Sequence, residues 1–206
     1  MRPPRMRVAL FGRSLAGFTL ANAMERAGHE VQMLSDPAEL SSFETLIIAV
    51  GDARLEATVE LLEPHVHRGL IVFHTCLSRG VQVLDPLETH GCVVAALAPF
   101  TLKRWAVTTL DELGETVVEL NIAEFYAETV ALSDAERAPF AARAYYAEML
   151  RRLHISAAVD AHFLSPSEEP PLVGEDMDTE EIIAAYRGAT DPGLRRSYVE
   201  VARRLG

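Results

Sequence analysis

The chain has 206 residues and a formal net charge of −11 at neutral pH, with 49% hydrophobic and 24% charged residues. This length suits one sizeable domain with a small addition, and the composition excludes a wholly disordered chain. The negative charge argues against non-specific binding of nucleic acid, and no apolar stretch reaches membrane-spanning length. Two cysteines are too few for a disulfide framework. We therefore expect a cytoplasmic protein that binds neither nucleic acid nor a membrane.

Short apolar runs alternate with amphipathic stretches over the first part of the chain. An apolar strand over 8–11 leads into Gly12, and a helix over 15–27 is stopped by Gly28. Further strands are predicted over 31–34, 46–50, 70–73, 93–97, 105–108 and 128–132, with helices over 54–62 and 111–126. Strands that alternate with helices predict an α/β fold with a doubly wound, mostly parallel sheet of the Rossmann type.

The pattern changes at Ser133, which with Glu136 forms the signature of a capping box at the start of a helix. That helix is predicted to run about 30 residues, to near Leu164. An acidic, proline-rich linker over 165–181 follows. Two short helices are predicted over 179–187 and 192–205.

We accordingly divide the chain into a dinucleotide-binding domain over 1–132 and a helical C-terminal region over 133–206. The helical region has few residues with which to bury its own apolar surface. This shortage predicts a homodimer.

The turn after the first strand carries the strongest functional signal. A dinucleotide site requires a tight turn there, close approach of the backbone to the pyrophosphate, and a helix N-terminus facing the phosphates. Gly12 and Gly17 occupy the first and third places of the G-x-G-x-x-G pattern, and Ser14 occupies the second. The predicted pyrophosphate site consists of Gly12, Arg13, Ser14, Leu15 and Gly17.

Two polar residues follow the second strand, near the place where an acid holds the ribose hydroxyls of NAD. Asp36 is the candidate acid, and Ser35 stands one residue earlier. A charged Asp36 at the ribose would repel the extra phosphate of NADP, so NAD is favoured over NADP. In the alternative interpretation Asp36 only caps a turn before Pro37.

Three short motifs follow later strands at the end of the sheet where Rossmann folds bind ligands. They are Val50-Gly51-Asp52, His74-Thr75-Cys76 and Ala98-Pro99-Phe100. In these motifs and in its order of elements, the chain resembles the 6-phosphogluconate-dehydrogenase-like superfamily. It is most similar to a Rossmann-like branch related to pyrroline-5-carboxylate and ketopantoate reductases. It departs from that pattern in lacking a histidine before Pro99 and a lysine or asparagine between Ser133 and Leu164.

The resemblance implies an NAD(P)-dependent oxidoreductase that acts on a small carbonyl or imine compound. Val50, Gly51, Asp52 and Thr75 would then line the nicotinamide. The role of His74 has two open interpretations. It either donates a proton during hydride transfer or anchors the loop that leads to Gly80.

The departures from the pattern also support a different class of protein. In this alternative the chain is a non-catalytic, degenerate Rossmann protein that binds a nucleotide as a signal or serves in assembly. A nucleoside-containing methyl donor is a third possible ligand. No metal site is predicted, because His65 and His67 have no third ligand that the sequence identifies.

Overall fold

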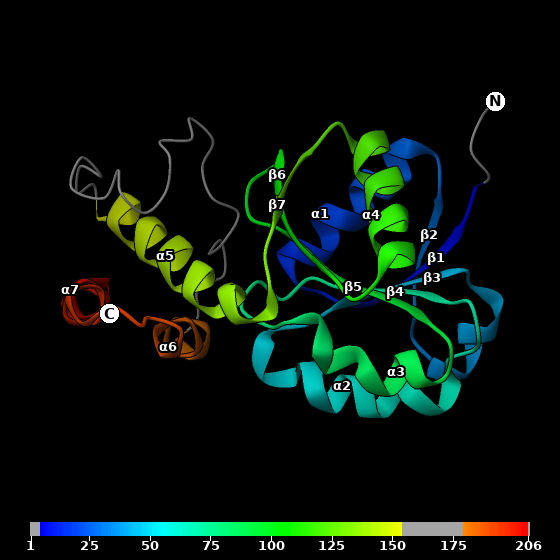
Figure 1. The fold of residues 1–206 in the computed structure, drawn as a ribbon, viewed down its shortest axis with the longest axis horizontal. Coiled ribbons are helices and arrows are strands. Elements are labelled where there is room, and N and C mark those ends of the chain that lie inside the picture. The colour runs from blue at the N-terminus through cyan, green and yellow to red at the C-terminus, as the bar shows by residue number, and fades with distance from the viewer. Residues whose placement is uncertain (1–4, 154–178, 206) are drawn as a thin grey trace.

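The computed structural model describes residues 5–153 and 179–205. A seven-stranded sheet with the order β2-β1-β3-β4-β5-β6-β7 lies between two layers of helices (Figure 1). Its strands are β1 (Arg7–Gly12), β2 (Glu30–Met33), β3 (Thr45–Ala49), β4 (Ile71–His74), β5 (Val93–Pro99), β6 (Arg104–Thr109) and β7 (Glu128–Ala131).

The helices α1 and α4 cover one face of the sheet, and α2 and α3 cover the other (Figure 1). These four helices are α1 (Leu15–Ala27), α2 (Leu55–Leu62), α3 (Asp85–Thr89) and α4 (Glu112–Phe125). Short 3-10 helices lie in the connections: η1 (Pro37–Ser42), η2 (Asp52–Arg54), η3 (Glu63–His65) and η4 (Val81–Leu84). The α3 helix and the 3-10 helices were not predicted, because segments this short carry no hydrophobic period.

Both faces of the sheet are buried, which explains the continuous apolar strands. In β3, Leu46 and Ile48 pack into the core beneath α2 and α3, whereas Ile47 and Ala49 pack into the core beneath α1 and α4. Successive side chains of a strand point to opposite faces, so a strand covered on both sides must be apolar throughout.

The sheet is mostly parallel, as predicted, and its direction changes at one place. The β6 strand pairs with β5 in antiparallel fashion, with Pro99 opposite Trp105. The connection between them spans only residues 100–103, which is far too short for the crossover that a parallel pair needs. The β7 strand then pairs with β6 in parallel.

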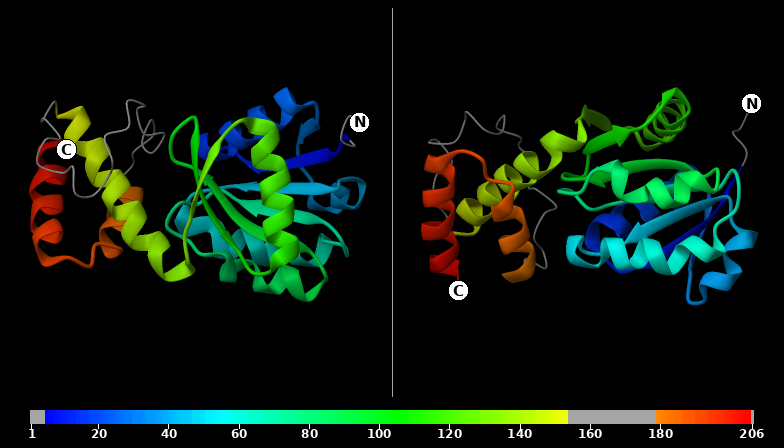
Figure 2. Two further views of the ribbon diagram at one scale, coloured as in Figure 1. Left: turned by 45° about the horizontal axis from the view of Figure 1, so that its top comes forward. Right: turned by 60° about the horizontal axis from the view of Figure 1, so that its bottom comes forward.

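Three helices extend from the sheet and pack on one another (Figure 2). They are α5 (Asp134–Arg152), α6 (Thr179–Arg187) and α7 (Pro192–Leu205). The predicted capping box at Ser133 is formed, with the Glu136 carboxylate accepting a hydrogen bond from the Ser133 amide over 2.8 Å.

The prediction for the end of α5 was wrong within the described part of the chain. The helix ends at Arg152, because the backbone of Leu153 turns out of the helical region with ψ at 4°. Residues 154–164 of the predicted helix, and most of the predicted linker, lie outside the described residues.

The three C-terminal helices share a hydrophobic core of their own. Tyr198 is 1% exposed and packs with Tyr146, Ala142 and Leu194 in this core. The C-terminal region therefore has a hydrophobic core of its own.

Candidate functional site

The order of strands reverses next to β1, which is the second strand of the sheet. The chain passes from β1 through α1 to β2 on one side, and then returns to β3 on the other side of β1. Ligands of doubly wound folds bind outside the carboxyl ends of the strands at such a switch point. The carboxyl ends of β1 and β3 are Gly12 and Ala49, which are paired in the sheet register.

Two glycines allow the first turn and α1 to approach β3 closely. Gly12 has a φ of 103°, and a Cβ there would overlap the carbonyl oxygen of Ala49. A Cβ at Gly17 would overlap the Cβ of Ala49. These are the tight-turn and helix-packing roles of the first and third glycines in a dinucleotide fingerprint.

Ser14, in the second place of the pattern, is the N-cap of α1. Its hydroxyl accepts a hydrogen bond from the Gly17 amide over 3.1 Å, and its own amide donates to the Ala49 carbonyl over 2.9 Å. The amides of Leu15 and Ala16 have no acceptor within the helix, because they lie in its first turn. The cap therefore leaves two amides at the N-terminus of α1 for an anionic ligand.

The candidate ribose residues lie in the connection after β2. Ser35, Asp36 and, across the first turn, Arg13 are exposed. The Asp36 carboxylate accepts a hydrogen bond from the Ala38 amide over 2.9 Å and is the N-cap of η1. This is the contact expected of a turn-capping residue, and it occupies one of the two carboxylate oxygens.

His74 is fully buried at the end of β4. Its Nε2 lies 3.0 Å from the carbonyl oxygen of Gly80, to which it must donate, and Nδ1 has no hydrogen-bond partner among the described residues. Burial, with a further contribution from the charge of Arg137, lowers the pKa of His74 to about 3. A neutral imidazole that donates to a loop carbonyl fits the anchoring interpretation. The catalytic interpretation requires the loop to open.

The other residues predicted to line the nicotinamide lie together at the ends of β3 and β4. Thr75 is 3% exposed and its hydroxyl lies 3.3 Å from that of Ser14. Val50 is buried, and its carbonyl accepts a hydrogen bond from the Cys76 thiol over 3.1 Å. Burial raises the pKa of Cys76 well above its ordinary value, which fits a packing role for this thiol.

Asp52 follows Gly51, and both residues are half-buried at the start of η2. The hydroxyl of Ser78 donates a hydrogen bond to its carboxylate. Burial raises the pKa of Asp52, although a hydrogen bond from Cys76 and the charges of Arg79 and Arg137 act in the opposite direction.

The helices α5 and α6 add three residues that were not predicted to belong to the site. Arg137 is fully buried and donates to the Cys76 carbonyl over 2.8 Å and to the Thr108 hydroxyl over 3.2 Å. Burial lowers its pKa to about 10, so it stays charged at neutral pH. Among the described residues its Nε has no partner.

The other two residues form a pair near Gly51. Tyr145 donates a hydrogen bond to Glu181 over 3.0 Å, and burial raises the pKa of Tyr145. A Cβ on Gly51 would lie 3.7 Å from the other carboxylate oxygen of Glu181. Only the spacing of Arg137, Ala141, Ala144 and Tyr145 along one helix face could have indicated that these side chains meet the sheet.

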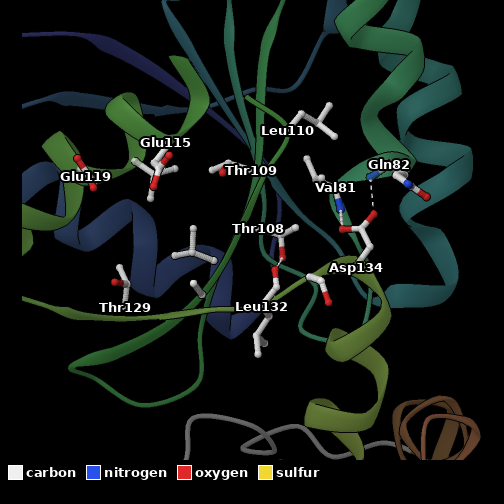
Figure 3. Close-up of a pocket in the computed structure, with 14 residues that line it drawn as sticks. Val81, Gln82, Thr108, Thr109, Leu110, Glu115, Glu119, Thr129, Leu132 and Asp134 are labelled. Carbon is white, nitrogen blue, oxygen red and sulfur yellow. Dashed lines mark hydrogen bonds between the residues drawn. The ribbon is translucent and has the colours of Figure 1, made fainter. Parts of the chain in front are cut away.

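A pocket of about 490 Å³ lies elsewhere, between α4, β6, β7 and the start of α5 (Figure 3). Glu115, Glu119 and Thr129 line it, and Asp134 at its rim accepts hydrogen bonds from the amides of Val81 and Gln82. None of the predicted site residues lines this pocket. A second pocket, of about 530 Å³, is lined by residues that include Ser78, Arg79 and Gly80.

Residues 5–153 and 179–205 contain no group of three or more histidine, cysteine or acidic side chains placed to hold a metal ion. No helix in these ranges is long and apolar enough to cross a membrane.

Comparison with known proteins identifies the fold. A family model for a Rossmann-like domain matches residues 36–99. The chain has a Rossmann-like fold. No curated protein matches its sequence.

Solved structures that share this fold include several dehydrogenases and reductases. The 3-hydroxyisobutyrate dehydrogenase of Mycobacterium tuberculosis is 11% identical, with a TM-score of 0.64 over 98% of this chain and 94% of the enzyme. The pyrroline carboxylate reductase of Plasmodium falciparum, solved with NADP bound, is 11% identical, with a TM-score of 0.56 over 100% of this chain and 77% of the reductase. The prephenate dehydrogenase of A. aeolicus, in complex with NAD+ and hydroxyphenyl propionate, is 12% identical, with a TM-score of 0.57 over 100% of this chain and 86% of the enzyme. The likeness to these structures confirms the predicted Rossmann-like fold.

Proposed function

We propose that the chain binds a nicotinamide dinucleotide at the switch point between β1 and β3 and acts as an NAD(P)-dependent oxidoreductase on a small carbonyl or imine compound. The observation that carries this proposal is the turn after β1. There Gly12 and Gly17 pack against Ala49, and the N-terminus of α1 offers the amides of Leu15 and Ala16. The dinucleotides bound to two solved structures of the same fold support it.

The bound dinucleotide would supply or accept a hydride, and the residues of the chain would hold it in place. The α1 N-terminus would face the pyrophosphate, since partial positive charge gathers at that end of a helix. Asp36, with Ser35 beside it, would face the ribose next to β2. The nicotinamide half would then extend the other way, over Val50, Gly51 and Asp52.

A charge placed at the N-terminus of α1 tests the site directly. We propose the variant Ala16→Asp, because an acid in the first turn stabilises a helix but repels a pyrophosphate. At a separation of about 5 Å and an effective dielectric constant of about 20, the repulsion is of the order of 3 kcal/mol. With screening by solvent and salt, we expect the Kd for NADH to rise by about 10- to 100-fold.

The matched control is Asn22→Asp, which adds the same charge to an exposed position of the same helix. Calorimetric titration with NADH and NADPH should show micromolar binding to the wild-type and control proteins and a preference for NADH. Equal affinity in Ala16→Asp and Asn22→Asp would place the ligand elsewhere. A preference for NADPH would remove Asp36 from the ribose site.

The observed environment of His74 supports a second candidate function, which is a nucleotide-binding protein without catalysis. Its imidazole is buried and neutral, and α5 carries no lysine or asparagine between Asp134 and Arg152. Tight binding of NADH together with no turnover across a broad panel of small carbonyl and imine compounds would favour this candidate.

We retain two further expectations as proposals. One is a homodimer, which light scattering at micromolar concentration tests, and a monomer there would refute it. The other is the division of the chain near Ser133, which limited proteolysis tests.

A further inference from the structure

Hydride transfer to a carbonyl or imine requires a proton at the oxygen or nitrogen, and neither of the expected donors is available among the described residues. The α5 helix carries neither lysine nor asparagine, and His74 is neutral, fully buried and engaged with the Gly80 carbonyl. A donor must lie at the carboxyl edge of the sheet, be reachable by a ligand, and hold a proton near the working pH.

Asp52 meets the first two conditions by its position. It follows β3, the strand next to the switch point, on the side of β1 away from β2. The adenosine half of a dinucleotide lies towards β2, so the nicotinamide half lies towards β3 and β4. Asp52 as a residue is partly exposed, and burial leaves its carboxyl poorly solvated.

The groups around Asp52 come from every neighbouring element. The loop after β4 provides the Ser78 hydroxyl, the Cys76 thiol and the Arg79 guanidinium, the last of which is paired with Glu56. The α5 helix provides Arg137 and Tyr145, and α6 provides Glu181 beside Gly51.

These neighbours oppose one another electrostatically. The arginines and the hydrogen bonds favour the ionised form of Asp52, while burial favours the protonated form and prevails, so the pKa is raised. The negative charge of Asp52 in turn contributes to the raised pKa of Tyr145, which shows that the two groups lie within electrostatic range.

We propose that Asp52 is the catalytic acid of this site, donating its carboxyl proton to the oxygen or nitrogen of the substrate as the hydride reaches the neighbouring carbon. This assignment rests on the proposed oxidoreductase function. In the step, the O–H bond of Asp52 breaks and a new O–H or N–H bond forms, using the electron pair released from the C=O or C=N bond. Asp52 is left as a carboxylate, which Ser78 stabilises by its hydrogen bond and Arg79 and Arg137 stabilise by their charge.

Ser78 also provides a route by which the proton returns. Its hydroxyl contacts the Asp52 carboxylate and lines the pocket of about 530 Å³. Water in that pocket can therefore reprotonate Asp52 through the Ser78 hydroxyl without entering the substrate side.

The charge of Asp52 should affect dinucleotide binding even without a substrate. The nicotinamide ring of NAD+ is positively charged and that of NADH is neutral, so an ionised Asp52 close to the ring favours NAD+. The affinity for NAD+ relative to NADH should therefore rise with pH as Asp52 loses its proton. We expect a rise of about tenfold across the pH range in which Asp52 titrates.

Calorimetric titrations of both dinucleotides across this pH range test the proposal. In Asp52→Asn the ratio of the two affinities should not change with pH, whereas both dinucleotides should still bind. In Ser78→Ala the midpoint should move up by about one pH unit, because the ionised form loses a hydrogen bond. The matched control is Glu60→Gln, which removes an exposed carboxylate from α2 and should behave as the wild type.

The possible failures are distinguishable. If neither dinucleotide binds the wild-type protein, the proposed function fails and the assignment of Asp52 fails with it. If both bind but the ratio is independent of pH, or depends on pH equally in Asp52→Asn, the assignment of Asp52 alone is overturned. If Asp52→Asn does not fold, an unmoved midpoint in Ser78→Ala overturns it.

Discussion

Gly17 and Gly114 make a matched pair that tests how closely α1 packs on the sheet. Each is the third residue of its helix, and its amide is capped by the side chain of Ser14 or Asp111. Both helices lie on the same face of the sheet (Figure 1). The two positions therefore differ chiefly in the space that a new methyl group would meet.

The structure gives a different magnitude for each replacement by alanine. A Cβ at Gly114 would lie 3.2 Å from a carboxylate oxygen of Asp111 and 3.4 Å from the Val94 carbonyl, contacts that need only small adjustments. A Cβ at Gly17 would overlap the Cβ of Ala49 and lie 2.9 Å from its Cα, in a buried central strand that cannot move aside. Alanine in a helix is favoured over glycine by about 1 kcal/mol, and overpacking costs about 1–3 kcal/mol or more.

We therefore expect Gly114→Ala to change the free energy of unfolding by between 0 and about +1 kcal/mol. We expect Gly17→Ala to lower it by about 2 kcal/mol, because the new Cβ would overlap the Cβ of Ala49 and crowd its Cα in a buried strand. Urea unfolding followed by circular dichroism measures both values. If Gly17→Ala were as stable as Gly114→Ala, the close packing of α1 against β3 would be wrong, and with it the role given to the glycine pattern.

Three further predictions concern single side chains of the site. Asp36→Asn keeps a side-chain oxygen that can cap η1, so the free energy of unfolding should not change. Loss of the charge should lower the preference for NADH over NADPH about tenfold, as measured by calorimetric titration. An unchanged preference would leave Asp36 with its capping role alone. The folded pKa of His74, about 3, lies below its ordinary value of 6.5, so the unfolded chain binds the proton first and stability should fall by about 2 kcal/mol between pH 7 and pH 5. Urea unfolding at each pH should show this loss of stability in the exposed control His90→Gln but not in His74→Gln. If the free energy of unfolding changed with pH equally in both variants, the burial of a neutral imidazole at His74 would be contradicted. Tyr145→Phe removes the hydrogen-bond donor to Glu181 and should lower the free energy of unfolding by about 1 kcal/mol in the same assay. Tyr126→Phe, at a 91% exposed position, should leave it unchanged. Equal free energies in the two variants would mean that the Tyr145–Glu181 contact does not stabilise the fold.

The elements that the sequence predicted well are those with strong local signals. The α1 helix has its predicted bounds, because Ser14 caps its start and Gly28, with φ at 102°, ends it in the left-handed region. The apolar β3 strand was also predicted, since burial on both faces removes polar residues from it. The bounds of α6 and α7 also agree with the prediction, because the apolar residues of both segments recur at helical spacing.

The features that the sequence did not predict depend on packing between distant segments. The antiparallel direction of β6 follows from the short connection at 100–103, yet the apolar run by itself carries no direction. Arg137 reads as an ordinary surface residue of a helix until α5 places it against the end of β4. Glu181 lies in an acidic stretch that is typical of solvent-exposed chain, and only the docking of α6 brings it to Tyr145.

Binding of NADH near the sheet is the central claim, and the fluorescence of Trp105 measures it most directly. Trp105 is the only tryptophan and is buried in β6, within the sheet that would hold the dinucleotide. Micromolar NADH should quench the Trp105 emission saturably, and energy transfer should give rise to emission from the dihydronicotinamide. Excess NAD+, which is not fluorescent, should reverse both effects by competition. A linear, unsaturable loss of emission up to millimolar NADH would contradict the account and leave the fold without its proposed ligand.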